Sequence, residues 1–199
     1  MQDAISAHVT AGKTYDFYMR HFGRDSIAGA GLTIISSVQV CTATEGCPAY
    51  LNATFNGTQM TYGRYFPRAL DVVSHELTHA VTANTSKLFY YYQSGAIDES
   101  LSDVFGEFTQ QDDPLTNVTA ATKWQIGEDL ATFLPGTVFA PYLRSMSDPT
   151  LKGNPDRMRS ALYSTDASDQ GGVHNNSGVN NKAAYLMTDG GTFNGKSVV

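Results

Sequence analysis

The sequence predicts an α+β protein in which a mixed β/α part precedes a mainly helical part. Two observations carry this prediction. Between residues 32 and 63, apolar residues roughly alternate with polar ones and an Asn56-Gly57 pair separates two β-prone runs, which is typical of short strands and a hairpin. After residue 68, four segments have the composition of helices, and the loops between them are rich in Asp, Pro, Gly and Asn.

The first half contains one predicted helix followed by strands. Residues 4–20 carry scattered aromatics and alanines compatible with a helix, which the glycines of 22–31 interrupt. Residues 32–40 have the apolar alternation of a half-buried strand, and residues 51–63 are expected to form the hairpin around Asn56-Gly57. The second half is expected to contain helices over residues 69–84, 96–110, 124–134 and 180–191.

Composition and charge limit the partners of the chain. It has 199 residues, 41% of them hydrophobic, which is enough to bury a core. The formal net charge is -6 without a basic stripe, so we expect no nucleic-acid partner. No apolar run approaches the ~20 residues of a membrane helix, and no secretory signal is visible at the N-terminus of this chain.

The two cysteines of the chain, Cys41 and Cys47, lie close together in the sequence. A short-range disulfide that closes a turn would fit an oxidising compartment, whereas two free thiols would fit a reducing one. The sequence leaves both interpretations open.

The segment DVVSHELTHAVT contains the pattern H-E-x-x-H at His75, Glu76 and His79. Residues four apart share one face of a helix, so the two imidazoles can bind one ion while Glu76 lies beside its open coordination position. The opposite face is apolar and can pack against a core. The alternative is an ordinary helix with two hydrogen-bonded histidines.

A catalytic zinc site needs a third protein ligand and leaves its fourth position to water. Glu99, near the start of the next predicted helix, can be that ligand. Asp103 lies one turn further on the same face and can orient an imidazole. Taken alone, a Glu and an Asp at this spacing usually form a solvated face. The combination with H-E-x-x-H favours a His₂Glu zinc centre.

Five ordered blocks, DVVSHELTHAVT, SGAIDESLSDVFGE, IGEDL, RSMSDP and GGVHNNSGVNNKAAYLM, resemble the thermolysin-like zinc metalloendopeptidases, or neutral proteases. The resemblance covers nearly the whole chain. It implies that residues 1–90 are the C-terminal part of an N-terminal α/β domain with an edge-strand hairpin and the H-E-x-x-H helix. It further implies that residues 91–199 are an incomplete, mainly α-helical domain, so that we expect the chain to be truncated at both ends.

The resemblance implies one catalytic zinc bound by His75, His79 and Glu99, with Glu76 as the base that activates water for peptide hydrolysis. In the family an asparagine is often found beside the second histidine, and Asp98 replaces it here. Such a carboxylate can accept the N–H of His79.

Two further side chains correspond to the family's stabilisers of the tetrahedral oxyanion, namely His174 and Tyr90. Asp169 would keep the imidazole of His174 protonated and oriented. Tyr91 and Tyr92 adjoin Tyr90, so a one-residue shift would change that assignment. Without the surrounding block, His174 would be interpreted as a loop or core histidine.

Substrate binding is assigned by the same resemblance. Asn52 and the backbone of Ala53, on the edge strand, would hold an extended peptide, and Arg144 would bind the carbonyl after the scissile bond. Outside these blocks they would be interpreted as a turn residue and a surface cation. An apolar pocket that favours bulky hydrophobic residues after the cleaved bond is assigned to Val72, Ile126, Leu130 and Leu143.

Calcium, partners and location also follow from the resemblance. Several family members bind calcium through acids, of which Asp71, Glu107 and Glu128 are retained, but Lys123 opposes a double site, so at most one weak site is expected. The expected partners are polypeptide substrates and the chain's own propeptide, with no membrane contact, a monomeric state and an extracellular location. The alternatives are a catalytically weak or inactive zinc-binding fragment and a non-cleaving peptide-binding module. Retention of Glu76 and His174 argues against the module.

Overall fold

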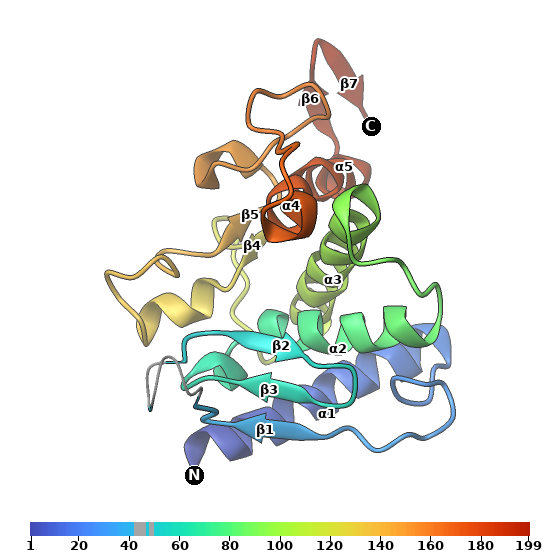
Figure 1. The fold of residues 1–199 in the computed structure, drawn as a ribbon, viewed down its shortest axis with the longest axis vertical. Helices are drawn as coiled ribbons and strands as arrows, with labels where there is room; N and C mark the ends of the chain where they lie inside the picture. The colour runs from blue at the N-terminus through green and yellow to red at the C-terminus, as the bar shows by residue number, and fades with distance from the viewer. Residues whose placement is uncertain (42–46, 48–49) are drawn as a thin grey trace.

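The computed structural model describes residues 1–41, 47 and 50–199 (Figure 1). It confirms the predicted α+β class: a small sheet and two helices form the lower layer of Figure 1, and the later helices rise above it. No helix in these ranges is long and apolar enough to cross a bilayer. The first part comprises α1 (Gln2–Phe22), β1 (Ser36–Val38), β2 (Ala53–Phe55), β3 (Met60–Tyr62), η1 (Phe66–Arg68) and α2 (Leu70–Asn84). The second part comprises α3 (Tyr92–Asp112), β4 (Gln125–Ile126), η2 (Glu128–Thr132), β5 (Arg144–Ser145), η3 (Pro149–Lys152), α4 (Asp169–Asn176), α5 (Gly178–Asp189), β6 (Gly191–Phe193) and β7 (Lys196–Val198).

The sheet has the order β1-β3-β2, with β1 parallel and β2 antiparallel to β3. The predicted hairpin is confirmed. Asn56 Oδ1 accepts the backbone N–H groups of Thr58 and Gln59 at 3.1 Å, and Gly57 adopts the positive φ of 96° that the turn requires. The strand predicted over residues 32–40 is too long. It is limited to Ser36–Val38 because its partner strand, β3, is only three residues long.

Helices α1 and α2 cover one face of this sheet (Figure 1). The main core lies between these layers, since side chains of β3, η1 and α2 pack together there. Its fully buried members include Met60, Tyr62, Phe66, Val73 and Leu77. The apolar face of α2 therefore points into the core and leaves its histidine face toward α3.

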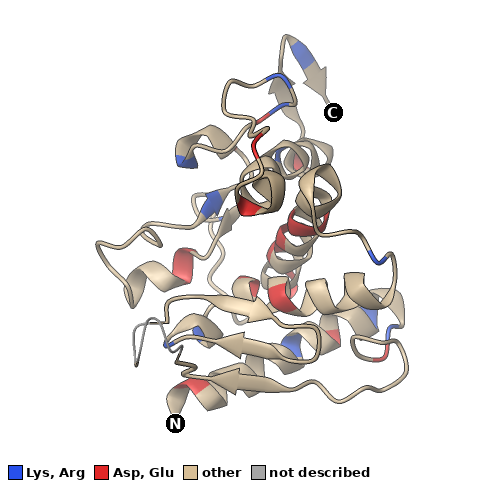
Figure 2. Cartoon of the chain, viewed as in Figure 1, with Lys and Arg blue, Asp and Glu red and all other residues tan. Residues whose placement is uncertain are grey.

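Helix α3 crosses α2 at close range. A Cβ on Gly106 would lie 2.7 Å from the carbonyl oxygen of Asp71, so only glycine permits this approach of the two backbones. Figure 2 shows acidic residues on successive turns of α3. The crossing brings Asp98, Glu99 and Asp103 against the polar face of α2.

The helix predicted over residues 124–134 is wrong. Trp124 and Gly127 have left-handed φ values of 71° and 76°, which interrupt a helix. Gln125–Ile126 instead forms β4, which pairs antiparallel with β5, and a 3-10 turn follows as η2. The backbone N–H of Gly127 also donates to Asp71 on α2. Tertiary contacts thus override the helical composition of this segment.

Helix α4 begins with a left-handed turn. Gln170, Gly171 and Gly172 have φ values of 50°, 88° and 74°, and a Cβ on Gly171 would lie 2.4 Å from the ring of Tyr92. This turn fixes the direction in which α4 carries His174. After α5 the chain forms the β6–β7 hairpin, which the sequence did not predict.

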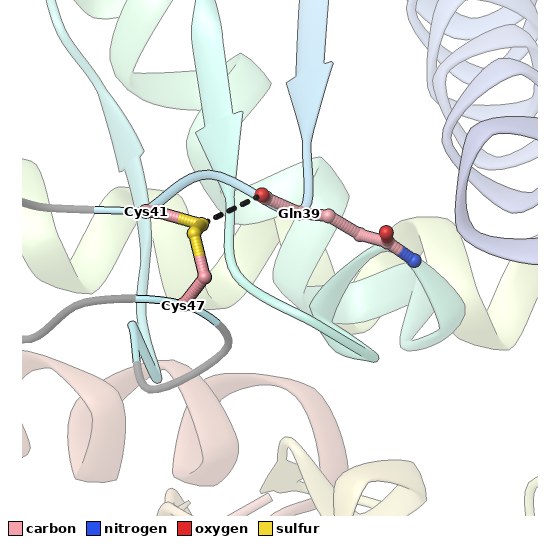
Figure 3. Close-up of a disulfide and its surroundings, with 3 residues drawn as sticks. All are labelled: Gln39, Cys41 and Cys47. Carbon is pink, nitrogen blue, oxygen red and sulfur yellow. Dashed lines mark hydrogen bonds between the residues drawn. A yellow bond between two sulfur atoms is a disulfide. The ribbon is translucent and has the colours of Figure 1, made fainter.

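Cys41 and Cys47 form a disulfide with a Cα–Cα distance of 5.0 Å (Figure 3). This settles the choice between disulfide and free thiols, while the turn between the two cysteines lies outside the described residues. The Cys41 sulfur lies 3.6 Å from the Gln39 carbonyl oxygen. Because a disulfide sulfur carries no proton, this is a van der Waals contact and not a donated hydrogen bond.

Candidate metal centre and active site

Helix α2 presents His75 and His79 side by side. Their ring centroids are 4.6 Å apart with an interplanar angle of 84°, and their Nε2 atoms are 3.0 Å apart. The helical repeat explains the proximity, because positions i and i+4 lie one turn apart on the same face. Both Nε2 atoms therefore point toward the same position, where one metal ion could bind.

Glu99 reaches this place from α3. Its Oε2 lies 3.4 Å from His75 Nε2 and its Oε1 lies 3.3 Å from His79 Nε2. The side chain is 1% exposed, and within the described residues its Oε2 has no hydrogen-bond partner. A buried carboxylate oxygen without a partner is costly unless a cation neutralises it.

The three side chains fit a zinc ion. Their ligand atoms all lie within 4.8 Å of one another, and within the described ranges they form the one such group of three or more His, Cys, Asp or Glu residues. Zn–N bonds of ~2.05 Å in a tetrahedron imply ligand separations of about 3.3 Å, near the 3.0 to 3.4 Å found here.

The outer nitrogens of both imidazoles are bound by carboxylates. His75 Nδ1 donates to Asp103 Oδ1 at 2.8 Å, and His79 Nδ1 donates to Asp98 Oδ1 at 2.9 Å. Because Nδ1 carries the shared proton, each Nε2 is free to bind a metal through its lone pair. Asp103 and Asp98 thus each bind the outer nitrogen of one of the two histidines.

The charges of the group favour a cation. Burial lowers the pKa of His75, but the hydrogen bond to Asp103 and the nearby negative charge of Glu99 outweigh it and raise this pKa to about 9. Burial raises the pKa of Glu99, but the two histidines outweigh it and hold this pKa well below its ordinary range. In the metal-free chain, protons on the imidazoles therefore balance the buried carboxylates, and a bound metal would displace them.

Tyr90 and His174 lie beside the same group. The Tyr90 hydroxyl donates to Glu99 Oε1, and it is 3.3 Å from His174 Nε2. Asp169 accepts from His174 twice, from Nδ1 at 2.6 Å and from the backbone N–H at 2.9 Å. The rings of Tyr91 and Tyr92 instead pack against each other, with their centroids 4.5 Å apart. Neither residue lines the cavity that lies over the metal-binding group.

A cavity of about 420 Å³ lies over the metal-binding group. It is bounded by β2, α2, the start of α3 and His174, and Glu76 faces it without taking part in the ligand set. Asn52 and Ala53 line it, with Asn52 Oδ1 accepting the Ala53 backbone N–H at 2.9 Å. Strand β2 is an edge of the described sheet.

Glu76 is 6% exposed at the floor of this cavity. Burial raises its pKa above the ordinary value, assisted by the charge of Glu99, although the two histidines and the Phe55 backbone N–H act in the opposite direction. A carboxylate with a raised pKa is a stronger base, which suits proton transfer near neutral pH.

The residues expected to form an apolar substrate pocket do not line this cavity. Val72, Leu130 and Leu143 belong to the main core, whereas Ile126 packs with Trp124 and Met146 in a second cluster. Arg144 is also outside the lining and binds Asp103 through Nε at 2.7 Å and Nη2 at 2.5 Å.

Four residues that sequence reasoning did not assign line the cavity: Thr54, Phe55, Ala83 and Leu88. The first two continue the edge strand beyond Asn52 and Ala53, so strand continuity was an available signal. Leu88 precedes Tyr90 by two residues, which in an extended segment points both side chains to the same side. The apolar side chains of Phe55 and Leu88 make one wall of the cavity hydrophobic.

A second group of acids comprises Asp71 on α2, Glu107 on α3 and Glu128 on η2, of which the first two are buried and the third is half-buried. Burial raises the pKa of Asp71 to about 6, that of Glu107 to about 7 and that of Glu128 to about 9. Glu128 Oε1 accepts from Gln110 Nε2 at 2.7 Å, and its Oε2 has no partner among the described residues. These acids are therefore protonated more readily in the folded chain than in the unfolded chain.

Glu128→Gln is expected to stabilise the chain at alkaline pH. A raised folded-state pKa contributes stability that is complete below the unfolded value of about 4.3 and is lost as pH rises through the folded value, about 9 for Glu128. With excess chelator at pH 8.5, the variant should melt about 3 °C or more above the parent, which corresponds to about 1 kcal/mol in the free energy of unfolding. At pH 4.5 the two melting temperatures should be close. Asp16→Asn, at an exposed position of α1, is the control. An unchanged pH slope in Glu128→Gln would contradict the assignment.

The fold and the site together define a class of protein. Two histidines and a glutamate on an H-E-x-x-H helix, joined by a glutamate from the next helix, are typical of zinc metallopeptidases. A family model described as "Thermolysin metallopeptidase, catalytic domain" matches residues 1–83, and one described as "Thermolysin metallopeptidase, alpha-helical domain" matches residues 86–199. The chain belongs to the thermolysin metallopeptidase family, which is zinc-dependent.

Individual relatives agree with this assignment. The chain is 45% identical to a bacillolysin of Bacillus cereus over 98% of its own length and 33% of the relative's. It is 44% identical to a thermolysin of Alicyclobacillus acidocaldarius over 98% and 34% of the two lengths. A solved structure of the precursor of protealysin, a metalloproteinase from Serratia proteamaculans, matches with a TM-score of 0.79 and 37% identity, over 94% of this chain and 59% of that one. The chain thus spans about a third of the length of the curated relatives it matches.

Proposed function

We propose that this chain carries the catalytic centre of a zinc-dependent endopeptidase. One observation carries the proposal: three ligand side chains, an uncommitted carboxylate and two hydrogen-bond donors meet at one cavity beside an edge strand. The three ligands are His75, His79 and Glu99, and the carboxylate is Glu76. Family membership supports the same activity, although the relatives are about three times longer than this chain.

A zinc ion held by these ligands would polarise a peptide carbonyl and lower the pKa of water. Glu76 is the base in this scheme, because it is buried at the cavity floor and has no role in the ligand set. It accepts a proton from the attacking water and passes this proton to the leaving nitrogen. Removal of bulk water from its surroundings makes the proton transfer more favourable.

His174 and Tyr90 are assigned to the oxyanion that develops on the carbonyl. Both reach the oxygen of Glu99, which places their polar atoms next to the ligand set. Asp169 holds the proton on His174 Nδ1 and keeps the ring turned toward the cavity. Each such donor can stabilise a transition state by ~3 kcal/mol.

The substrate is assigned to the edge of β2 as an added antiparallel strand. Asn52 and the Ala53 backbone lie at the end of β2 that borders the cavity, and an edge strand offers free backbone groups for such pairing. Arg144 is assigned to the carbonyl after the scissile bond, with Asp103 holding its guanidinium. Val72, Ile126, Leu130 and Leu143 remain our proposal for the apolar specificity pocket.

Hydrolysis of an unfolded protein should therefore be zinc-dependent and should occur before bulky hydrophobic residues. The measurement is mass spectrometry of the fragments from one digest, run with and without a chelator, together with the zinc content of the same sample. Cuts before Leu, Ile, Val or Phe that disappear with chelator and return with zinc are the expected result. An apolar pocket discriminates among these residues by only about 1–3 kcal/mol, so mixed hydrophobic sites are expected.

Other outcomes have definite meanings. Cuts mainly beside Lys, Arg, Asp or Glu would contradict the pocket assignment. Full zinc content without cleavage would favour the second candidate, a catalytically weak or inactive zinc-binding fragment.

Calcium binding is a secondary proposal. Asp71 lies close enough to Glu107 and Glu128 for its charge to raise the pKa of each. Lys123 Nζ donates to the two carboxylate oxygens of Asp189 at 2.8 Å and 2.9 Å. Its positive charge is therefore held at α5. At most one weak site is proposed among these acids, because the zinc group is the one set of three or more potential ligands within 4.8 Å in the described residues.

We further propose an extracellular location, a monomeric state and two structural units at residues 1–90 and 91–199. The Cys41–Cys47 disulfide supports an oxidising compartment. Polypeptides are the proposed substrates. The chain's own propeptide is a further proposed partner, since the matching protealysin structure is that of a precursor.

A further inference from the structure

We propose that Asn181 is a positioning residue that fixes the carboxylate of Asp103 and, through it, the zinc ligand His75. Asn181 lies on α5, far from His75 in the sequence, and is 1% exposed. The metal-binding part of this inference does not depend on peptidase activity. It rests on the zinc site of the proposed function.

Asp103 receives four hydrogen bonds in a fully buried position. His75 Nδ1 and Arg144 Nη2 donate to its Oδ1 at 2.8 Å and 2.5 Å, while Arg144 Nε and Asn181 Nδ2 donate to its Oδ2 at 2.7 Å and 2.8 Å. One carboxylate thus joins α2, β5 and α5.

The orientation of the Asn181 amide supports a dedicated role. Its Oδ1 is buried and has no hydrogen-bond partner among the described residues. A flipped amide would turn this oxygen toward the Asp103 carboxylate, where two acceptors would repel each other. Asn181 Oδ1 therefore stays without a partner in the described part of the chain while Asn181 Nδ2 donates to Asp103. An unsatisfied buried oxygen is unfavourable, so its presence indicates that the bond to Asp103 matters more.

Loss of the Asn181 donor should affect His75 through rotation of Asp103. With Nδ2 removed, the two Arg144 bonds become the main constraint on the carboxylate, and its Oδ1 is free to move away from His75 Nδ1. The imidazole then loses the partner that keeps its proton on Nδ1 and its Nε2 lone pair directed at the metal. The expected consequence is weaker zinc binding without loss of any ligand.

The test measures zinc affinity by competition with a chromophoric chelator for Asn181→Leu, which keeps the side-chain volume but removes the donor. We expect affinity to fall by about 10- to 100-fold, as for other partners of metal-bound histidines. The visible spectrum of the cobalt(II)-loaded chain should also change, because it reports ligand geometry. Leu186→Ala, a buried truncation on the same helix, is the control and should keep the parent's affinity and spectrum.

Asn181→Ser gives a second test if the leucine variant does not fold, and the same loss is expected because the shorter hydroxyl does not reach Asp103. Parent-like affinity and spectrum in a folded Asn181 variant would overturn the proposal. An equal loss in Leu186→Ala would also overturn it, because a loosened α5 would then be sufficient. If the parent itself binds no zinc, the metal centre of the proposed function fails together with this inference.

Discussion

Glu99→Ala is expected to abolish tight zinc binding. The substitution removes one of three ligands and leaves two imidazoles, one fewer than the three protein ligands of a catalytic zinc site. The loss should exceed the roughly 10- to 100-fold effect of removing an outer partner of a ligand. Zinc stoichiometry after dialysis, with affinity measured by chelator competition, is the readout.

A matched pair distinguishes ligand loss from loss of a buried charge. Glu99 and Glu107 both lie on α3 and are both 1% exposed, but only Glu99 belongs to the metal-binding group. Glu99→Gln should bind zinc much more weakly than the parent, whereas Glu107→Gln should bind it normally. Full zinc occupancy in Glu99→Ala would show that the third ligand is misassigned.

Glu76→Gln is expected to retain zinc but lose at least ~100-fold in peptide hydrolysis, the scale of a general base. Glutamine keeps the shape of the side chain and a hydrogen-bonding group, but it lacks a basic carboxylate oxygen. Because Glu76 faces the cavity and is not a ligand, the metal should be unaffected. Zinc content and initial hydrolysis rates measured on one sample test both statements.

His79→Ala provides the contrast for this variant, since it removes a ligand and should lose metal and activity together. The comparison requires a parent chain that cleaves. A Glu76→Gln chain that keeps most of the parent's activity would rule out water activation by this carboxylate. A fall in zinc content equal to that of His79→Ala would instead make Glu76 part of the metal site.

The sequence predicted the pairing of the two histidines because the relevant order is local. His75 and His79 are four residues apart, and the helical repeat alone places them on one face. The same reasoning paired Glu99 with Asp103 on the next helix. The hairpin at Asn56-Gly57 was predicted for a similar reason, since its turn is formed by adjacent residues.

One predicted helix was wrong because distant segments meet there. Residues 124–134 have a helical composition, yet pairing with Arg144–Ser145 and the contact of Gly127 with Asp71 make them a strand and a 3-10 turn. The proposed pocket residues are all aliphatic in the sequence. Nothing local indicates that they divide between two clusters outside the cavity, which depends on how β4 and η2 pack.

The sequence by itself determined the family of this protein, the ligand types and their helical spacing, because these depend on residue identity and on a 3.6-residue repeat. Only the tertiary structure decided that Glu99 meets the histidines, because the approach of α3 to α2 depends on Gly106 facing the Asp71 backbone. It likewise brought Asn181, from α5, onto the carboxylate that holds His75. Contacts between residues far apart in the chain follow from how helices pack, and no local pattern encodes that packing.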